Sequence, residues 1–140
     1  MNLIAERVEV WVASIEDKPG SLANILSSLR EAGADLNFIL ARREPDQPGR
    51  SVVYITPLMG DTELEAAATL GFNLTARVHS VRVEGRNQAG IAAQLAAKLA
   101  AAGLNLRGFS AAVLGTQFTL YIGLDSAEDA AKALTVLQQV

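Results

Sequence analysis

Residues Arg7–Leu36 read RVEVWVASIEDKPGSLANILSSLREAGADL, and residues Arg77–Leu106 read RVHSVRVEGRNQAGIAAQLAAKLAAAGLNL. The two stretches align without a gap at a shift of 70 residues. The pairs that coincide are Arg7/Arg77, Val8/Val78, Gly20/Gly90, Ala23/Ala93, Leu29/Leu99, Ala32/Ala102, Gly33/Gly103 and Leu36/Leu106. An internal repeat is stronger evidence of domain number than chain length. We therefore expect two related modules, residues 1–76 and residues 77–140.

Modules of this size have small cores. A domain of about half this chain buries only roughly 60% of its unfolded surface and is marginally stable alone. The chain is 50% hydrophobic, with one Trp, two Tyr and four Phe among its 140 residues. We expect the two modules to share an interface, either within the chain or between chains.

The net charge of −3 argues against a nucleic-acid partner, because binding a phosphate backbone needs a concentrated basic face. Arg42, Arg43 and Arg50 form a small basic cluster that fits a solvated hairpin tip. The run Arg107–Val113 invites comparison with the RNA-recognition consensus, but it falls on a second strand and has alanine where an aromatic is needed.

The residue inventory also limits catalysis, metal binding and membrane insertion. The chain has no cysteine and a single histidine, His79, so we expect no metal site, no cofactor and no catalytic nucleophile–base pair. No stretch approaches the roughly 20 apolar residues of a membrane span, and the N-terminus lacks an apolar signal core. The sequence predicts a soluble, cytoplasmic protein that is not an enzyme.

The periodicity of apolar residues and the turn formers between them predict the same order of elements in both modules. In the first module we expect strand 8–15, a helix from Ser21 to Gly33, strand 36–42, a hairpin loop at 44–49, strand 51–56, a helix at 62–70 after Asp61, and a short strand at 72–76. In the second we expect strand 78–84, helix 92–102, strand 105–114, strand 118–124 and a helix at 127–137 capped by Asp125 or Ser126.

This order is β-α-β-β-α-β, a ferredoxin-like α+β arrangement in which both helices cover one face of an antiparallel sheet. The second module lacks its own C-terminal strand. Under the repeat shift, residues near Leu3–Glu6 correspond to the last strand of the first module. We expect them to close the sheet of the second module.

With these elements in place, the chain resembles the ACT domain family. The stretch Glu16–Leu22 reads EDKPGSL, and Gly33–Leu36 reads GADL, which match an acidic or amide residue, a basic-Pro-Gly turn, a helix and a Gly-x-Asn/Asp-Ile/Leu motif. The second module carries the same frame as Asn87–Gly90 (NQAG) and Gly103–Leu106 (GLNL).

The resemblance implies a regulatory module that binds an amino acid at the interface of ACT modules. The loop before the helix and the polar residue after it would hold the ligand. The positions that match are Asp17, Gly20 and Asp35 in the first module, and Asn87, Gly90 and Asn105 in the second. A glycine there lets a ligand approach the backbone, and a helix N-terminus offers N–H groups to a carboxylate.

The second module is expected to be the better site, because asparagine amides both donate and accept hydrogen bonds whereas two aspartates repel a carboxylate. The alternative is a ligand-free structural interaction module. The structural alternatives for these residues are chain reversal at the glycines and turn hydrogen bonds at Asp17 and Asn87.

An assembly is also expected from the sequence. Val10 and Val12 make one sheet face of the first module apolar, where the second module has Ser80 and Arg82. Soluble monomers seldom expose such a patch. This pattern predicts a homodimer through that face, and the output of a regulatory module predicts a regulated protein partner.

Overall fold

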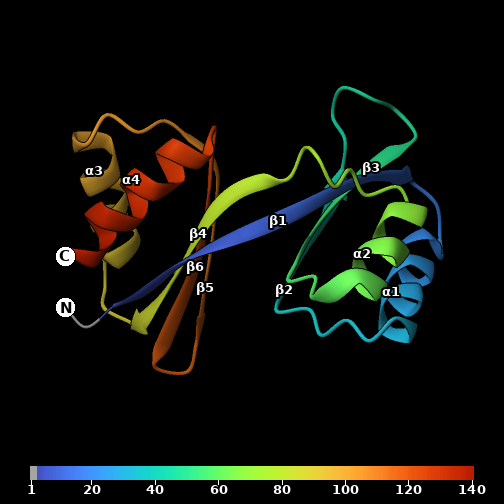
Figure 1. The fold of residues 1–140 in the computed structure, drawn as a ribbon. Helices are drawn as coiled ribbons and strands as arrows, with labels where there is room; N and C mark the ends of the chain where they lie inside the picture. The colour runs from blue at the N-terminus through green and yellow to red at the C-terminus, as the bar shows by residue number, and fades with distance from the viewer. Residues whose placement is uncertain (1–2) are drawn as a thin grey trace. The chain divides into compact units, whose positions relative to one another are not determined.

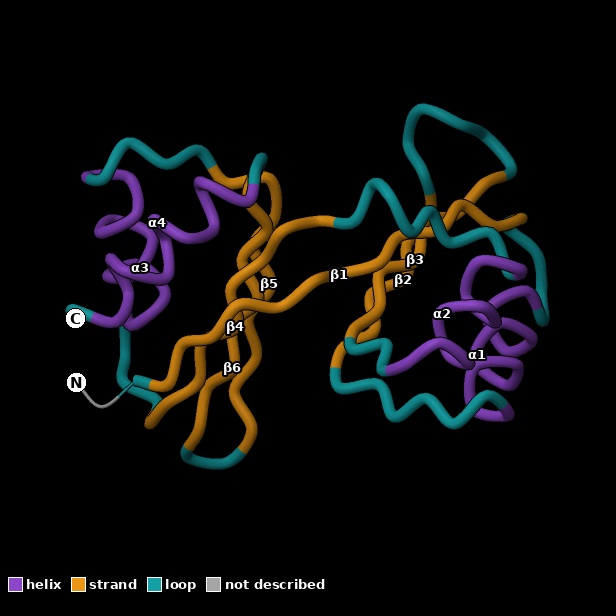
Figure 2. The backbone as a smooth tube through the Cα atoms, viewed as in Figure 1, coloured by secondary structure: helices purple, strands orange, loops and turns teal. Residues whose placement is uncertain are grey.

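The computed structural model describes residues 3–140, whose strands and helices appear in Figures 1 and 2. In chain order the elements are β1 (Ile4–Glu16), α1 (Ser21–Glu31), β2 (Phe38–Arg43), β3 (Arg50–Thr56), α2 (Gly60–Thr69), β4 (Val78–Arg86), α3 (Ile91–Ala101), β5 (Leu106–Leu114), β6 (Gln117–Leu124) and α4 (Ala127–Gln138). The predicted α+β class with ferredoxin-like units is confirmed. None of the described helices is long and apolar enough to cross a membrane.

Two compact units divide the chain. The first unit is Glu9–Arg77, and the second unit joins Val78–Val140 to the N-terminal residues up to Val8. The boundary therefore falls inside β1. The start of β1, up to Val8, belongs to the second unit, and the rest of β1, from Glu9, belongs to the first.

In the first unit, β2, β3 and β1 lie side by side in that order, and neighbouring strands are antiparallel. Helices α1 and α2 lie together on one face of these strands (Figure 1). Trp11, Ala13 and Ile15 alternate along β1 toward the helices, as residues two apart on a strand must. They pack with fully buried Leu29 and Ile55, so Trp11 is a core residue.

In the second unit, β1, β4, β6 and β5 lie side by side in that order, with β4 and β5 each antiparallel to β6. Helices α3 and α4 lie on one face of the sheet (Figure 1). The core between them contains the fully buried Leu95, Leu99, Ile122 and Leu137. β5 forms the edge of this sheet, and its side chains are mostly exposed.

The start of β1 closes the sheet of the second unit, as the sequence predicted for residues near Leu3–Glu6. Leu3 and Ala5 pack against the core of the second unit. Glu6 Oε1 lies 3.6 Å from Nη1 of Arg82. A hydrogen bond to Glu84 raises the pKa of Arg82 despite the opposing effect of burial, so Arg82 is a fixed cation for this contact.

The strand predicted at residues 72–76 is absent from the described structure, which has a turn there. The side-chain oxygen of Asn73 accepts hydrogen bonds from the N–H of Thr75 (3.0 Å) and from its hydroxyl (2.8 Å). These bonds bend the chain away from an extended path. Phe72, at 3% exposed, still fills the core of the first unit.

α1 begins at Ser21, as expected, but Gly20 at φ 88° precedes it and no described side chain caps it. α2 begins at Gly60, ahead of the expected start at residue 62. A positive φ is open to glycine at little cost, so Gly20 itself turns the strand into the helix. The predicted cap at Ser126 is confirmed, since its hydroxyl accepts the N–H of Asp129 at 3.0 Å.

The two valines expected on the apolar sheet face of the first unit differ in exposure. Val10 is 5% exposed, and Val12 is half-buried. Val12 thus remains partly accessible, and the homodimer through this face stays a prediction.

Candidate functional site

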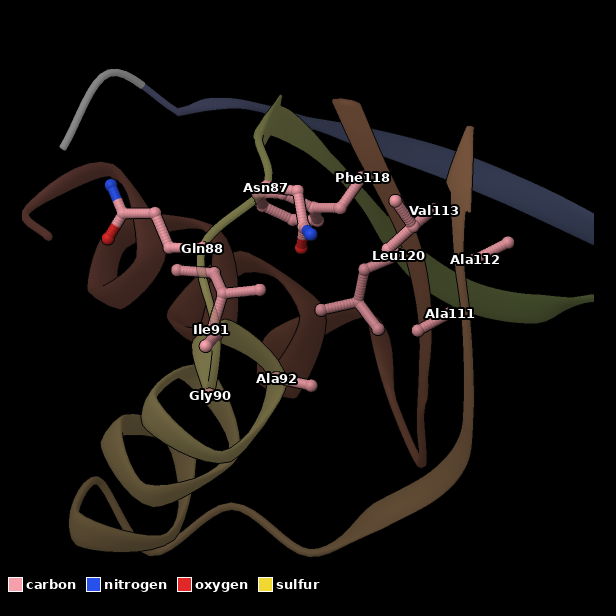
Figure 3. Close-up of a pocket in the computed structure, with 11 residues that line it drawn as sticks. Asn87, Gln88, Gly90, Ile91, Ala92, Ala111, Ala112, Val113, Phe118 and Leu120 are labelled. Atoms are coloured by element: carbon pink, nitrogen blue, oxygen red, sulfur yellow. The ribbon is translucent and has the colours of Figure 1, made fainter. Parts of the chain in front are cut away.

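A cavity of about 320 Å³ lies in the second unit, between the loop that precedes α3 and the paired strands β5 and β6 (Figure 3). It is lined by Asn87, Gln88, Ala89, Gly90, Ile91, Ala92, Ala111, Ala112, Val113, Phe118 and Leu120. Its volume is at the low end for a small-molecule site, which fits a ligand of few atoms.

Short backbone hydrogen bonds fix the loop side of the cavity. The N–H of Asn87 donates to the carbonyl of Thr116 at 2.8 Å, and the N–H of Ile91 donates to Gln88 at 3.1 Å. Gly90 has φ 82° and starts the helix, and a Cβ added there would meet nothing within 4 Å. The glycine is therefore required by its backbone conformation, and it also leaves open space in front of the helix.

The helix start leaves backbone donors at the cavity. The first-turn N–H groups of an α-helix lack acceptors within the helix. In α3 the N–H of Gln94 already bonds to Gly90, and no described side chain caps the helix. The N–H groups of Ala92 and Ala93 are thus free for an acceptor, at the end of the helix that favours negative charge.

The strand side of the cavity is apolar. In the ladder, Ala111 lies opposite Leu120 and Val113 lies opposite Phe118. Directly opposed residues share a face, so all four side chains stand on the helix side of the sheet. Leu120 and Phe118 are buried, whereas Val113 is 55% exposed at the sheet edge. Figure 3 shows Leu120 and Ala111 pointing into the space beside the loop.

Three residues were predicted to bind ligand in the second module, and two of them line this cavity. Asn87 and Gly90 do so, with the Asn87 side chain exposed. Asn105 is exposed between α3 and β5 and is not among the lining residues. The fold therefore brings the loop residues together with β5 and β6, and it leaves Asn105 outside this group.

The matching loop of the first unit has different chemistry. Oδ2 of Asp17 accepts a hydrogen bond from Nε of Arg43 at 2.9 Å, and Gly20 has the same left-handed conformation as Gly90. Asp35 is exposed between α1 and β2. The predicted ligand carboxylate of Asp17 is thus already engaged by a cation of its own unit.

A second ion pair lies in the same loop. Nζ of Lys18 is 2.9 Å from Oε2 of Glu16. The hydrogen bond from Lys18 and then its charge hold the pKa of the Glu16 carboxyl below its ordinary value. This loop is therefore a charged surface, in contrast with the neutral loop at Asn87.

Sequence reasoning missed the strand side of the cavity. Ala111, Val113, Phe118 and Leu120 alternate along two strands that were correctly predicted, so their shared faces could be inferred from a period of two. The register between β5 and β6 and the distance of β5 from α3 cannot be read from the sequence, because both depend on tertiary packing.

The cavity offers no group for acid–base or metal chemistry. No ionisable side chain is among its lining residues. Across residues 3–140, no three His, Cys, Asp or Glu side chains cluster as metal ligands would. The arrangement can bind a small molecule through amides, backbone N–H groups and apolar contacts.

Among the comparisons with known proteins, only the one with solved structures finds proteins similar to this chain. No family model matches the sequence, and no protein of curated function is detectably similar to it. The solved structure of protein BT0572 from Bacteroides thetaiotaomicron matches with a TM-score of 0.77 and 15% identity, over 96% of this chain and 90% of that one.

Two further matches come from aspartate kinases. The ligand-free regulatory subunit of aspartate kinase from Thermus thermophilus has a TM-score of 0.68 and 19% identity, over 99% of this chain and 96% of that one. Escherichia coli aspartokinase III in complex with lysine and aspartate has a TM-score of 0.55 and 13% identity, over 99% of this chain and 32% of that one. At these identities the likeness establishes the fold alone, which this chain shares with the regulatory subunit of aspartate kinase from Thermus thermophilus.

Proposed function

We propose that this protein is a non-enzymatic regulatory module that binds an amino acid in the cavity beside Asn87 and Gly90. The single observation that carries the proposal is the position of that cavity, at the loop where the repeated motif precedes α3. The repeated motif in the sequence independently predicts a ligand site at this loop. The two tandem sequence modules, residues 1–76 and residues 77–140, are part of the same proposal, with the start of β1 completing the sheet of the second one.

The ligand's two charged groups have complementary partners there. A carboxylate at the start of α3 would accept hydrogen bonds from the N–H groups of Ala92 and Ala93, and the helix dipole would favour its charge. The exposed amide of Asn87 can accept from an ammonium or donate to a carboxylate. The N–H of Asn87 is already used by Thr116, so only its side chain is available.

The fold likeness supports a regulatory role without assigning a ligand. A Thermus thermophilus protein of this fold is a regulatory subunit of aspartate kinase, and aspartokinase III from Escherichia coli was solved with lysine and aspartate. We propose that binding in this chain is likewise read out by another protein. That reader is either a regulated partner or a second copy of this chain.

The alternative function is a structural interaction module that takes no ligand. The observation in its favour is the edge strand β5, where Val113 and Leu114 are 55% and 87% exposed. Edge strands offer unpaired backbone groups to another chain. A protein of this second kind would associate through β5 whether or not amino acids were present.

Thermal unfolding with each of the twenty amino acids separates the two functions. A ligand at about 100 times its dissociation constant should add roughly 2.7 kcal/mol to the free energy of unfolding. The matched control is the amide of each amino acid that stabilises, which lacks the carboxylate and should stabilise far less. If none of the twenty raises the melting temperature, the proposal fails and the ligand-free module takes its place.

A further inference from the structure

The wall of the cavity predicts the chemistry of the ligand's side chain. Ile91 is 6% exposed, Phe118 3% and Leu120 1%, and together with Ala111 and Val113 they give the cavity an apolar floor. The polar groups lie at the loop, on the opposite side from β6. A ligand whose carboxylate meets the start of α3 would therefore point its side chain toward β5 and β6.

A charged side chain would find no partner there. Removing an ion from water without a compensating charge or hydrogen bonds is strongly unfavourable. An apolar side chain would instead gain from leaving water. The same wall that rejects a lysine or aspartate side chain would stabilise one of valine or leucine.

The first unit provides an internal comparison, because the same register recurs there with different residues. Arg43 lies opposite Ser51 in β2 and β3, just as Val113 lies opposite Phe118 in β5 and β6. Arg43 reaches the loop and pairs with Asp17 at 2.9 Å. In the first unit, the edge-strand residue equivalent to Val113 is therefore an arginine that contacts the loop before α1.

We infer that the cavity selects an amino acid with an uncharged, apolar side chain, and that Val113 determines this preference from the open edge of the sheet. The inference rests on the proposed function, since it specifies which amino acids that site takes. Val113 can vary to set this preference because it is the exposed residue of the apolar wall. Phe118 and Leu120 are instead buried in the core.

The test is calorimetric titration of the whole chain with leucine, valine, lysine and aspartate. Leucine or valine should bind at least tenfold more tightly than lysine or aspartate. Val113→Arg places the first unit's residue at the cavity and should weaken leucine or valine binding tenfold or more. The matched control is Leu114→Arg, which adds the same charge one residue away, at a side chain that is 87% exposed and does not line the cavity.

Folding of the variants is checked independently of binding. Because Val113 is more than half exposed, both arginine variants should melt within a few degrees of the parent without ligand. Val113→Thr keeps the shape and adds only a hydroxyl, so it should weaken binding by less than Val113→Arg.

The outcomes separate this inference from the proposed function. Tighter binding of lysine or aspartate than of leucine and valine would overturn the apolar preference and leave amino-acid binding intact. Equal affinity in Val113→Arg and Leu114→Arg would overturn the role of Val113. No binding of any of the four, nor of the other sixteen amino acids, would overturn the proposed function and this inference together.

Discussion

At the scale of single residues, one position distinguishes the two units. Asp17 and Asn87 occupy equivalent loop positions in the repeat, but Asp17 is engaged by Arg43, and Asn87 lines a cavity with an exposed amide. The Asp17–Arg43 pair itself contributes little to stability, on the order of 0–1 kcal/mol, because Arg43 is exposed. Its consequence is chemical, since it neutralises the carboxylate that a ligand's ammonium would need.

This difference predicts an order of effects on ligand binding. Asn87→Ala should weaken binding of the amino acid more than tenfold, because a hydrogen bond to a charged group contributes about 1.5–3 kcal/mol. Asp17→Ala should leave the affinity within about twofold. Asn105→Ala is the second control, since the structure places Asn105 outside the cavity lining. Calorimetry that gives Asp17→Ala the larger loss would move the site to the first unit.

At the scale of elements, two of the four described helices have a left-handed glycine as the residue just before their first turn. Gly20 precedes α1 at φ 88°, and Gly90 precedes α3 at φ 82°, with no side chain capping either helix. α4 instead uses the hydroxyl of Ser126. Because no described side chain caps α1 or α3, N–H groups at the start of each helix are available to an acceptor. At the start of α3 a cavity lies beside them.

Gly90→Ala tests the backbone requirement directly. A residue with a Cβ should cost about 1–2 kcal/mol in the left-handed conformation, although the added methyl meets no neighbour. Gly108→Ala is the matched control, because Gly108 lies in edge strand β5 outside the left-handed region and its added Cβ also meets nothing. Urea unfolding should show a loss for Gly90→Ala and little change for Gly108→Ala. Equal effects would contradict a conformational role for Gly90.

An element could be predicted when the residues that determine it are close together in the sequence. α1, α3 and the strands around them are flanked by glycines and carry local periodicity, so their type was correctly predicted. The strand expected at residues 72–76 was wrong because a single side chain, Asn73, turns the backbone there. The loop half of the cavity could be predicted from the repeat. The β5–β6 half could not, because register and packing are set by residues distant in sequence.

At the scale of the whole molecule, the two units cannot be separated by a single cut in the chain, because both contain part of β1. Its start completes the sheet of the second unit, and its end lies in the core of the first. The repeat in the sequence and the units in the structure therefore do not share a boundary. A cut between residues 76 and 77 would divide the repeats and leave the second unit without its closing strand.

Removing residues 1–6 should destabilise the second unit. Amide exchange protection in Phe118–Ile122 of β6 should fall, because Leu3 and Ala5 would no longer pack on its core. Two point variants refine the test: Ala5→Asp should reproduce the loss, whereas Ile4→Asp should not, since Ile4 is 61% exposed. Unchanged protection in β6 after the deletion would show that the second unit does not depend on β1.

The shared strand also sets an order of events during synthesis. The beginning of β1 leaves the ribosome before its partner β4, which follows only after the whole first unit has been made. The first unit can fold while translation continues, whereas the second unit needs a segment that was made before the first unit. Closing a loop of that length slows folding and leaves sheet edges exposed in the meantime. The nascent chain should therefore be most vulnerable to aggregation and proteolysis while the second unit is being made, before the start of β1 pairs with β4.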